Sequence, residues 1–321
     1  MSESIKSPKA ATEPAIRVQK LVKKYGDFVA VNDISFSIRE GEIFGVIGPN
    51  GAGKTTAVEC ISGLRVPDSG SVSIYGLSPR KDRNKIRKFV GVQLQQSAMP
   101  PRLKLGEAVE LFASFYSDPL NPNDLLETLG IKDIKNSMFK NLSGGQKQRL
   151  SIALALIGNP KIAILDELTT GLDPEARRET WALIEGVRDR GVTVILVTHF
   201  MDEAERLCDR LALINHGKLV VLDTPEAIAA LAGGNRVRLV PSQPVDDKTL
   251  YAIPGVNGVE RKERYITVTG TGDLAMSVIN SLAKIGVKVS DIEARGGNLD
   301  DAFVKLTKEE PSNDSGGVVK P

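Results

Sequence analysis

The segment from Gly48 to Thr56 constrains the fold of this chain more than any other part of the sequence. It reads GPNGAGKTT and matches the pattern G-x-x-x-x-G-K-[ST]. The apolar run IFGVI precedes it and the helix-like run KTTAVECIS follows it. A glycine-rich loop between a strand and a helix directs backbone N–H groups and the positive helix end at phosphate oxygens. This context disfavours a chance match in an ordinary turn, so the sequence predicts a phosphate-binding loop.

The residue types in this loop indicate a nucleoside triphosphate with a magnesium ion. A lysine at position 54 reaches the β and γ phosphates, and the hydroxyl of Thr55 is a ligand for Mg²⁺. We therefore predict ATP and Mg²⁺ as the bound species. The predicted nucleotide-contacting residues of the loop are Gly48, Pro49, Asn50, Gly51, Ala52, Gly53, Lys54, Thr55 and Thr56.

A second element of the predicted phosphate site is the run KIAILDE, which ends in two adjacent carboxylates. Taken alone, such an ending is common, and a capped strand end is the simpler interpretation. Downstream of a phosphate-binding loop it is the expected partner of that loop. We then expect Asp166 to hold Mg²⁺ through its water shell and Glu167 to activate the attacking water as general base.

Short apolar runs alternate with helical periods along most of the chain. The runs are near-continuous, as expected for strands that are buried on both faces of a parallel sheet. They lie at Ile43 to Ile47, Ile162 to Leu165, Val192 to Val197 and Leu211 to Ile214. Between Ile16 and Ile38 the pattern alternates, which favours antiparallel strands with one buried face. The predicted fold class is therefore α/β, with a mostly parallel sheet and an N-terminal antiparallel part.

The chain of 321 residues is long enough for one large and one small domain. Small and polar residues predict flexible tails at residues 1–14 and 309–321. The large domain is predicted at residues 15–232, and helical periods without strand signals place a helical lobe at about residues 97–140. After a Gly-Gly turn, new strand patterns and one helix-like run predict a small α+β domain at residues 233–308.

Composition disfavours several classes of protein. Lys and Arg number 42 against 40 Asp and Glu, a net charge of +2 spread along the chain, so nothing indicates a nucleic-acid partner. Two cysteines without a CxxC or His-rich neighbourhood disfavour disulfides or zinc and favour a reducing, cytoplasmic setting. The N-terminus lacks the apolar core of a signal peptide, and no apolar run is long enough to span a bilayer. We expect a chain that does not cross a membrane by itself.

The run LSGGQKQR, from Leu142 to Arg149, separates this chain from other phosphate-loop enzymes. Serine is a good N-cap, the glycines permit close approach of an anion, and the following helix directs its dipole at the cap. An ordinary capped helix is the alternative. Together with the loop, the run resembles the signature motif of ABC ATPases. The resemblance implies that two chains sandwich two ATP molecules, and that each γ-phosphate is contacted by the other subunit's signature residues, Ser143, Gly144, Gly145 and Gln146.

Three further residues match the ABC pattern. His199, after the strand pattern VTVILVT, is similar to the catalytic switch histidine near the γ-phosphate. Tyr25, in KKYGDFVAV, is similar to the aromatic residue that stacks on adenine, with a strand-edge tyrosine as the alternative. Asp173, in TTGLDP, is similar to the residue of the loop that crosses the dimer interface.

A glutamine matches the ABC pattern, and a leucine departs from it. Gln95, in GVQLQQS, is similar to the glutamine that senses Mg²⁺ and links to the helical lobe, although Gln93 and Gln96 compete for this assignment. The family usually has proline after the catalytic glutamate, whereas this chain has Leu168. Leucine restores a backbone N–H and frees φ, so we expect a less rigid interface loop.

The ending NLDDAFVKLT, from Asn298 to Thr307, resembles the C-terminal extension of drug-resistance-type exporters of the ABC-2 class. A generic amphipathic helix is the alternative. In that class the ATPase and the membrane subunit are separate chains. The resemblance implies an ATPase on the cytoplasmic face of the cell membrane, working as a pair, most simply a homodimer, beneath a transmembrane permease subunit.

Two other functions remain open from the sequence. A soluble ABC ATPase could act on ribosomes or DNA, although such proteins carry two cassettes or long coiled-coil insertions, and this chain has one cassette without an insertion. An importer ATPase could use the C-terminal domain as a regulatory module that binds a small ligand or protein. The C-terminal ending favours the exporter.

Overall fold

The computed structural model describes residues 13–93, 99–232 and 235–308. The chain divides into two compact units, Met1–Leu222 and Asp223–Pro321, and each is described by itself. The predicted tails fall outside the described residues except for Glu13 and Pro14, and Gln95 also falls outside them. Within the described ranges, no helix combines the length and the apolar character that crossing a bilayer requires.

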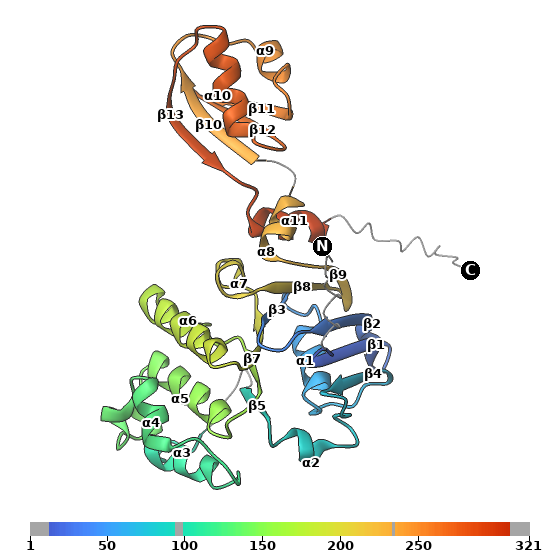
Figure 1. Cartoon of the computed structure of the whole chain (residues 1–321), viewed down its shortest axis with the longest axis vertical. Helices are drawn as coiled ribbons and strands as arrows, with labels where there is room; N and C mark the ends of the chain where they lie inside the picture. Colours follow the sequence, from blue (N-terminus) through green and yellow to red (C-terminus); the bar gives the residue numbers. More distant parts are fainter. Residues whose placement is uncertain (1–12, 94–98, 233–234, 309–321) are drawn as a thin grey trace, which may run out of the picture. The chain divides into compact units, whose positions relative to one another are not determined.

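An antiparallel sheet opens the first unit (Figure 1). Strand β1 (Ile16–Tyr25) pairs with β2 (Phe28–Ile38) on one side and with β4 (Ser69–Ile74) on the other. The register places Ile16 opposite Ile38 and Ile74, and all three side chains are buried. The alternating sequence pattern thus forms a sheet with one buried face, as expected for antiparallel strands.

A six-stranded sheet forms the centre of the same unit, in the order β5-β6-β7-β3-β8-β9. The pairings from β5 through β8 are parallel, which confirms the predicted α/β class with a mostly parallel sheet. Every residue of β3, β6 and β7 is buried, because helices and the antiparallel sheet cover both faces. The strands are β3 (Ile43–Ile47), β5 (Val90–Gln93), β6 (Ile162–Asp166), β7 (Thr193–Thr198), β8 (Arg210–Asn215) and β9 (Lys218–Asp223).

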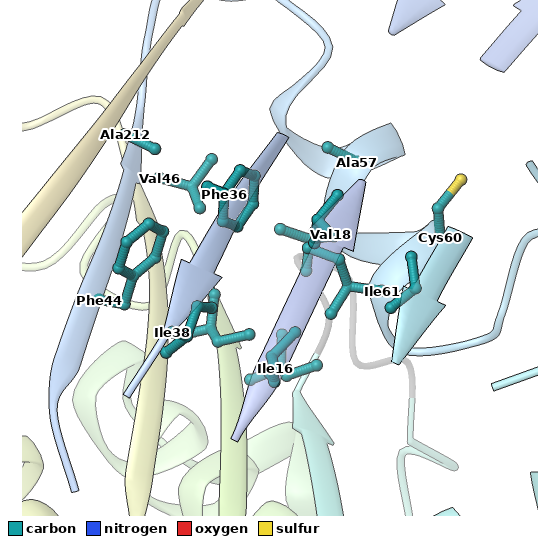
Figure 2. Packing of buried hydrophobic residues seen from close by; sticks show 14 of the residues in the cluster. Ile16, Val18, Phe36, Ile38, Phe44, Val46, Ala57, Cys60, Ile61 and Ala212 are labelled. Atoms are coloured by element: carbon teal, nitrogen blue, oxygen red, sulfur yellow. The ribbon is translucent and has the colours of Figure 1, made fainter. Parts of the chain in front are cut away.

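The main core lies between the antiparallel strands and the parallel sheet, with helix α1 (Lys54–Ile61) packed into it. Figure 2 shows Phe36 of β2 facing Phe44 of β3, and their rings stack with 5.3 Å between centroids. Ile61 of α1 faces the β1 side of this core. Each large apolar side chain contributes roughly 1.5–3 kcal/mol on burial. The loop between β3 and α1 is therefore anchored in the core at both ends.

Helices follow β5 in the segment where a helical lobe is predicted. They are α3 (Leu105–Ala113), α4 (Pro122–Thr128) and the 3-10 turns η1 (Lys132–Ile134) and η2 (Phe139–Asn141). Three helices then return to the sheet: α5 (Gly144–Leu156), α6 (Pro174–Asp189) and α7 (Met201–Leu207). In Figure 1, α5 and α6 lie on the opposite side of the parallel strands from α1 and the antiparallel sheet. The short helix α2 (Arg83–Ile86) precedes β5.

The second unit contains a four-stranded antiparallel sheet in the order β11-β12-β10-β13. Its chain order gives the β-α-β-β-α-β arrangement of a ferredoxin-like domain. Val237, Val268 and Val278 belong to a core of its own. The elements are β10 (Asn235–Pro241), α9 (Asp247–Tyr251), β11 (Val256–Lys262), β12 (Tyr265–Gly270), α10 (Leu274–Lys284) and β13 (Val289–Arg295).

The second unit begins at Asp223, earlier than the predicted start at residue 233. The reason is that helix α8 (Pro225–Ala230) packs against the C-terminal helix α11 (Leu299–Lys308). Lys305 Nζ donates a hydrogen bond to the Leu231 carbonyl at 3.2 Å. This contact joins two residues that lie 74 positions apart in the sequence. No local sequence pattern indicates it.

Candidate nucleotide site

The backbone of the Gly48–Thr56 loop requires glycine at two points. At Gly48 an added Cβ would lie 2.1 Å from the Ile214 carbonyl oxygen, and at Gly53 it would lie 2.0 Å from that of Ala30. Gly53 also has a φ of 98°, in the left-handed region that favours glycine. It is the N-cap of α1, whose first N–H groups have no acceptor within the helix. The loop therefore presents backbone donors at a positive helix end.

Lys54 lies within this loop and is only 5% exposed. Its Nζ atom donates to the carbonyl oxygens of Gly48 at 2.9 Å and Pro49 at 3.0 Å. Burial lowers the pKa of Lys54, and the carboxylates of Glu167 and Asp166 oppose that shift. The ammonium group is thus held at the loop by carbonyl groups and lies within the field of both carboxylates.

Asp166 ends strand β6 and is 1% exposed. Its Oδ2 atom accepts a hydrogen bond from Thr55 Oγ1 at 3.4 Å. Its backbone N–H donates to Oε1 of Gln93, at the end of the neighbouring strand β5, at 3.0 Å. Burial, and next the charge of Glu167, raise the pKa of Asp166 to about 6. The residues of β5, β6 and the phosphate loop thus converge on one carboxylate.

The Thr55 and Asp166 oxygens fit the demands of Mg²⁺. Asp166 Oδ1 is buried and has no hydrogen-bond partner among the described residues, so it is an acceptor that a cation could satisfy. Hydroxyl and carboxylate oxygens are the hard ligands that Mg²⁺ prefers, usually together with waters and substrate phosphates. The described chain contains no cluster of three or more His, Cys, Asp or Glu side chains suited to a metal.

Glu167 and His199 meet where the neighbouring strands β6 and β7 end. Glu167 has a φ of 49°, uncommon for a residue with a side chain, and its N–H donates to the Val197 carbonyl at 2.9 Å. His199 Nδ1 lies 3.4 Å from Glu167 Oε1. The carboxyl ends of parallel strands lie at one edge of a sheet, which brings these distant residues together. This pair can act on a group at the phosphate loop, since Glu167 also lines the loop cavity.

A cavity of about 400 Å³ lies over the phosphate loop. Tyr25 lines it with a half-exposed ring, and the guanidinium of Arg65 lies 5.3 Å from the centre of that ring. Phe28 lines the same cavity and is 61% exposed. Sequence reasoning missed Phe28, although a second aromatic residue just after the turn from β1 was a visible signal. The cavity is lined by Tyr25, Phe28, Ala30, Asn50, Gly51, Ala52, Gly53, Lys54, Thr55, Thr56 and Glu167.

The signature segment forms a capping box at the start of α5. Ser143 Oγ accepts from the Gln146 N–H at 3.3 Å, and Gln146 Oε1 accepts from the Ser143 N–H at 2.9 Å. Nearby, Asp173 caps α6 by accepting from the N–H groups of Glu175 and Ala176, both at 3.0 Å. Both helix starts line one cavity of about 360 Å³. Two helix N-termini at one cavity favour an anion there.

The signature cavity and the phosphate-loop cavity share no lining residue. The structure therefore brings together Tyr25, Lys54, Asp166, Glu167 and His199 at one place, and the signature residues with Asp173 at another. Gln95 and its competitor Gln96 lie outside the described residues, whereas Gln93 holds the backbone of Asp166. Leu168 is fully buried, and the effect of this residue on loop rigidity stays a prediction.

Comparison with known proteins identifies the family of this chain. Residues 31–170 match the family model described as ABC transporter. The daunorubicin resistance ATP-binding protein DrrA3 of Streptomyces coeruleorubidus is 30% identical over 307 residues, which cover 93% of this chain and 97% of the relative. The chain belongs to the ABC transporter ATP-binding family. It has the fold and the sequence of an ABC ATPase, as its signature segment indicates.

Other relatives support the same family assignment. The Nod factor export ATP-binding protein I of Rhizobium etli is 32% identical over 307 residues, with 92% of this chain and 94% of the relative covered. Among solved structures, the dimeric form of a bacterial ABC transporter cassette matches with a TM-score of 0.60 and 30% identity, over 65% of this chain and 98% of the cassette. A dimeric post-hydrolysis cassette bound to ADP and phosphate matches with a TM-score of 0.59 and 28% identity, over 65% of this chain and 98% of that cassette.

Proposed function

We propose that this chain is the ATP-hydrolysing subunit of an ABC-2-type exporter and powers a separate membrane subunit by ATP-driven dimerisation. The observation that carries the proposal is the approach of His199 to Glu167, which lines the phosphate-loop cavity, with the signature segment at a different cavity. An ABC ATPase with this division needs a second cassette to complete each site. The dimeric cassettes among its structural relatives support that pairing.

In the proposed reaction, the Gly48–Thr56 loop binds the phosphates through backbone N–H groups and the Lys54 ammonium. Thr55 and Asp166 would hold Mg²⁺, which when bound neutralises charge on the phosphate oxygens. Glu167 accepts a proton from the water that attacks the γ-phosphate. His199, 3.4 Å from Glu167, contacts the γ-phosphate from the same side. Tyr25 and Phe28 supply aromatic surface for adenine.

The signature residues act in trans in this proposal. Ser143, Gly145 and the start of α5 would face the γ-phosphate held by the second subunit, which closes two ATP molecules between two chains. Hydrolysis removes the γ-phosphate that joins the subunits, so the pair separates. The contact of Asp173 with the signature cavity is consistent with a place in the same interface.

Two observations support an exporter with a membrane partner. DrrA3 and the Nod factor export protein match this chain over more than nine-tenths of its length, and the match therefore extends into the second unit. A groove of about 740 Å³ also lies beside the end of α3, and Phe115, which lines it, is 69% exposed. Exposed apolar side chains of this size often mark contact surfaces. We place the protein on the cytoplasmic face of the membrane, with this groove toward the permease.

A capture experiment tests the proposal. Tagged Glu167→Gln with Mg-ATP should trap the closed pair on its partner in detergent-solubilised membranes, and Lys54→Ala serves as the matched control that cannot close. Recovery of a multi-spanning membrane protein with Glu167→Gln alone is expected. Recovery of ribosomal or DNA-bound proteins instead would favour a soluble ABC ATPase. Binding of a sugar or an ion to the second unit would favour an importer.

A further inference from the structure

Helices α6 and α7 meet around a carboxylate that the proposed reaction does not use. Glu203 of α7 is fully buried in the first unit. Its Oε1 atom accepts a hydrogen bond from Trp181 Nε1 of α6 at 3.0 Å. Trp181 is itself only 9% exposed. An ionisable group in such a position is costly, and a merely structural contact between two helices does not require one.

Two hydroxyl groups lie beside the same carboxylate. Burial, the largest effect, raises the pKa of Glu203, while the hydroxyls of Thr198 and Thr169 lower it. Glu203 Oε2 and Thr169 Oγ1 are buried, and neither has a hydrogen-bond partner among the described residues. The Thr169 hydroxyl lies close enough to Glu203 to affect its pKa, yet no hydrogen bond joins this buried donor to the buried acceptor. A small movement of the Thr169 loop would form that bond.

The two threonines belong to the two segments that carry the catalytic pair. Thr169 lies in the loop between Glu167 and Asp173, the N-cap of α6. Thr198 is the last residue of β7, directly before His199, and its Oγ1 accepts from the Phe200 N–H at 3.0 Å. Glu203 therefore lies between the loop of the catalytic base and the segment of the switch histidine.

Contacts at the surface of the two helices are weaker by nature. Arg177 of α6 pairs with Asp202 of α7 at 3.3 Å and lies 4.3 Å from the ring centre of Phe200. Arg206 of α7 pairs with Glu185 of α6 at 3.4 Å. Water and salt screen exposed ion pairs, whereas a hydrogen bond to a buried charged group is not screened in this way. The buried Glu203 contacts are therefore the stronger link between the segments.

We propose that Glu203 is a positioning residue, which ties the Glu167–Asp173 loop to the His199 segment so that both move together when the ATP-bound pair closes. In the closed state the Thr169 hydroxyl donates to Glu203 Oε2. The link connects the chain's own phosphate site with the Asp173 side of the signature cavity. This inference rests on the proposed ATPase function and adds a route by which one ATP site affects the other.

The test compares five single variants and one double variant with the wild-type chain. Glu203→Leu removes all the acceptors, Glu203→Gln keeps one acceptor for Trp181, and Thr169→Val removes only the hydroxyl. Glu185→Gln changes the exposed pair between the same helices and is the matched control. For each variant, kcat and KM for ATP and ATP-driven dimerisation are measured. Trp181→Phe removes the N–H donor together with part of the buried ring, and it is included because Glu203→Leu could fail to fold.

We expect Glu203→Leu to lower kcat by about tenfold to a hundredfold with KM unchanged, since misplacement of about 1 Å costs about a hundredfold. Thr169→Val and Trp181→Phe should lower kcat less, Glu203→Gln should restore most of it, and Glu185→Gln should match wild type. The double variant Glu203→Leu with Thr169→Val should be no slower than Glu203→Leu, because both remove one link.

Three outcomes would overturn the inference. The first is that Glu203→Leu keeps the wild-type kcat. The second is that Glu203→Leu loses kcat and ATP affinity in parallel. The third is that the losses of kcat in Glu203→Leu and Thr169→Val multiply in the double variant. If Glu203→Leu does not fold, wild-type kcat in both Thr169→Val and Trp181→Phe would overturn it. Failure of the proposed function is distinguishable, since then the wild-type chain itself would show no ATP hydrolysis that depends on Glu167.

Discussion

His199 Nδ1 lies 3.4 Å from Oε1 of Glu167, although 32 positions of sequence separate the two residues. Each side chain follows the end of a buried strand, and β6 and β7 are parallel neighbours. A water or phosphate at the loop cavity would therefore meet a carboxylate and an imidazole from one side.

Glu167→Gln should bind ATP but lose about 10²- to 10⁴-fold in turnover, the range for removal of a general base. The amide keeps the shape of the side chain but cannot accept the proton. Steady-state phosphate release and nucleotide binding measured on the same preparation check this. A turnover near wild type would show that another group is the base.

Lys54→Ala should lower ATP affinity at least tenfold, since hydrogen bonds to charged groups contribute about 1.5–3 kcal/mol each. The backbone donors of the loop remain, so some binding persists. Calorimetric titration with ATP checks this, with the 71%-exposed lysine variant Lys85→Ala as control. Equal affinity in the two variants would exclude the phosphate-loop interpretation.

Ser143→Asp should leave ATP binding by the monomer intact and abolish ATP-driven dimerisation. Aspartate is as good an N-cap as serine, so α5 keeps its start, but its charge repels the γ-phosphate of the second subunit. Size-exclusion chromatography with ATP in the Glu167→Gln background checks this. Asn121→Asp changes the N-cap of α4 in the same way and should dimerise normally. Normal dimerisation of Ser143→Asp would argue against contact in trans.

Phe28→Ala should weaken ATP binding by roughly fivefold to a hundredfold, since stacking of a base on an aromatic ring contributes about 1–3 kcal/mol. The ring is 61% exposed, so its removal should not disturb the fold. Tyr251→Ala removes an aromatic ring that is 52% exposed in the second unit and is the control. Binding of ATP is compared with that of inorganic triphosphate, which lacks the base and should not respond to Phe28→Ala.

Glu203→Gln should raise the melting temperature at alkaline pH. The pKa of Glu203 is raised by burial, so between the ordinary carboxyl pKa and this raised pKa the folded chain binds more protons than the unfolded chain. Stability from this group therefore falls as pH rises through that window, and the uncharged glutamine avoids the loss. Below the ordinary carboxyl range the difference between variant and wild type should vanish. Thermal unfolding at several pH values checks this, and an advantage that grows toward acid pH would contradict it.

Several features of the fold follow from local patterns in the sequence. The runs that begin at Ile43 and Ile162 form strands that are buried on both faces. A near-continuous apolar run is typical of such strands, because both of its faces need cover from other elements. The phosphate loop was predictable because its geometry requires glycine. A Cβ added at Gly48 or Gly53 would lie about 2 Å from a carbonyl oxygen, so no other residue type fits there. Strands β4 and β5 were not predicted, since SGSVSI and VGVQ each contain only two apolar side chains and give no clear signal.

The sequence by itself determined the chemistry: the residue types of the phosphate loop, the two carboxylates after β6, and the capped signature helix. Tertiary structure alone decided which of them meet. The parallel order β5-β6-β7-β3 brings Gln93, Asp166 and His199 to one sheet edge and leaves Ser143 at another cavity. The packing of α6 on α7 buries Glu203 against Trp181, and α8 joins α11 in the second unit. Such contacts connect segments that are far apart along the chain, and a local pattern carries no information about its distant partner.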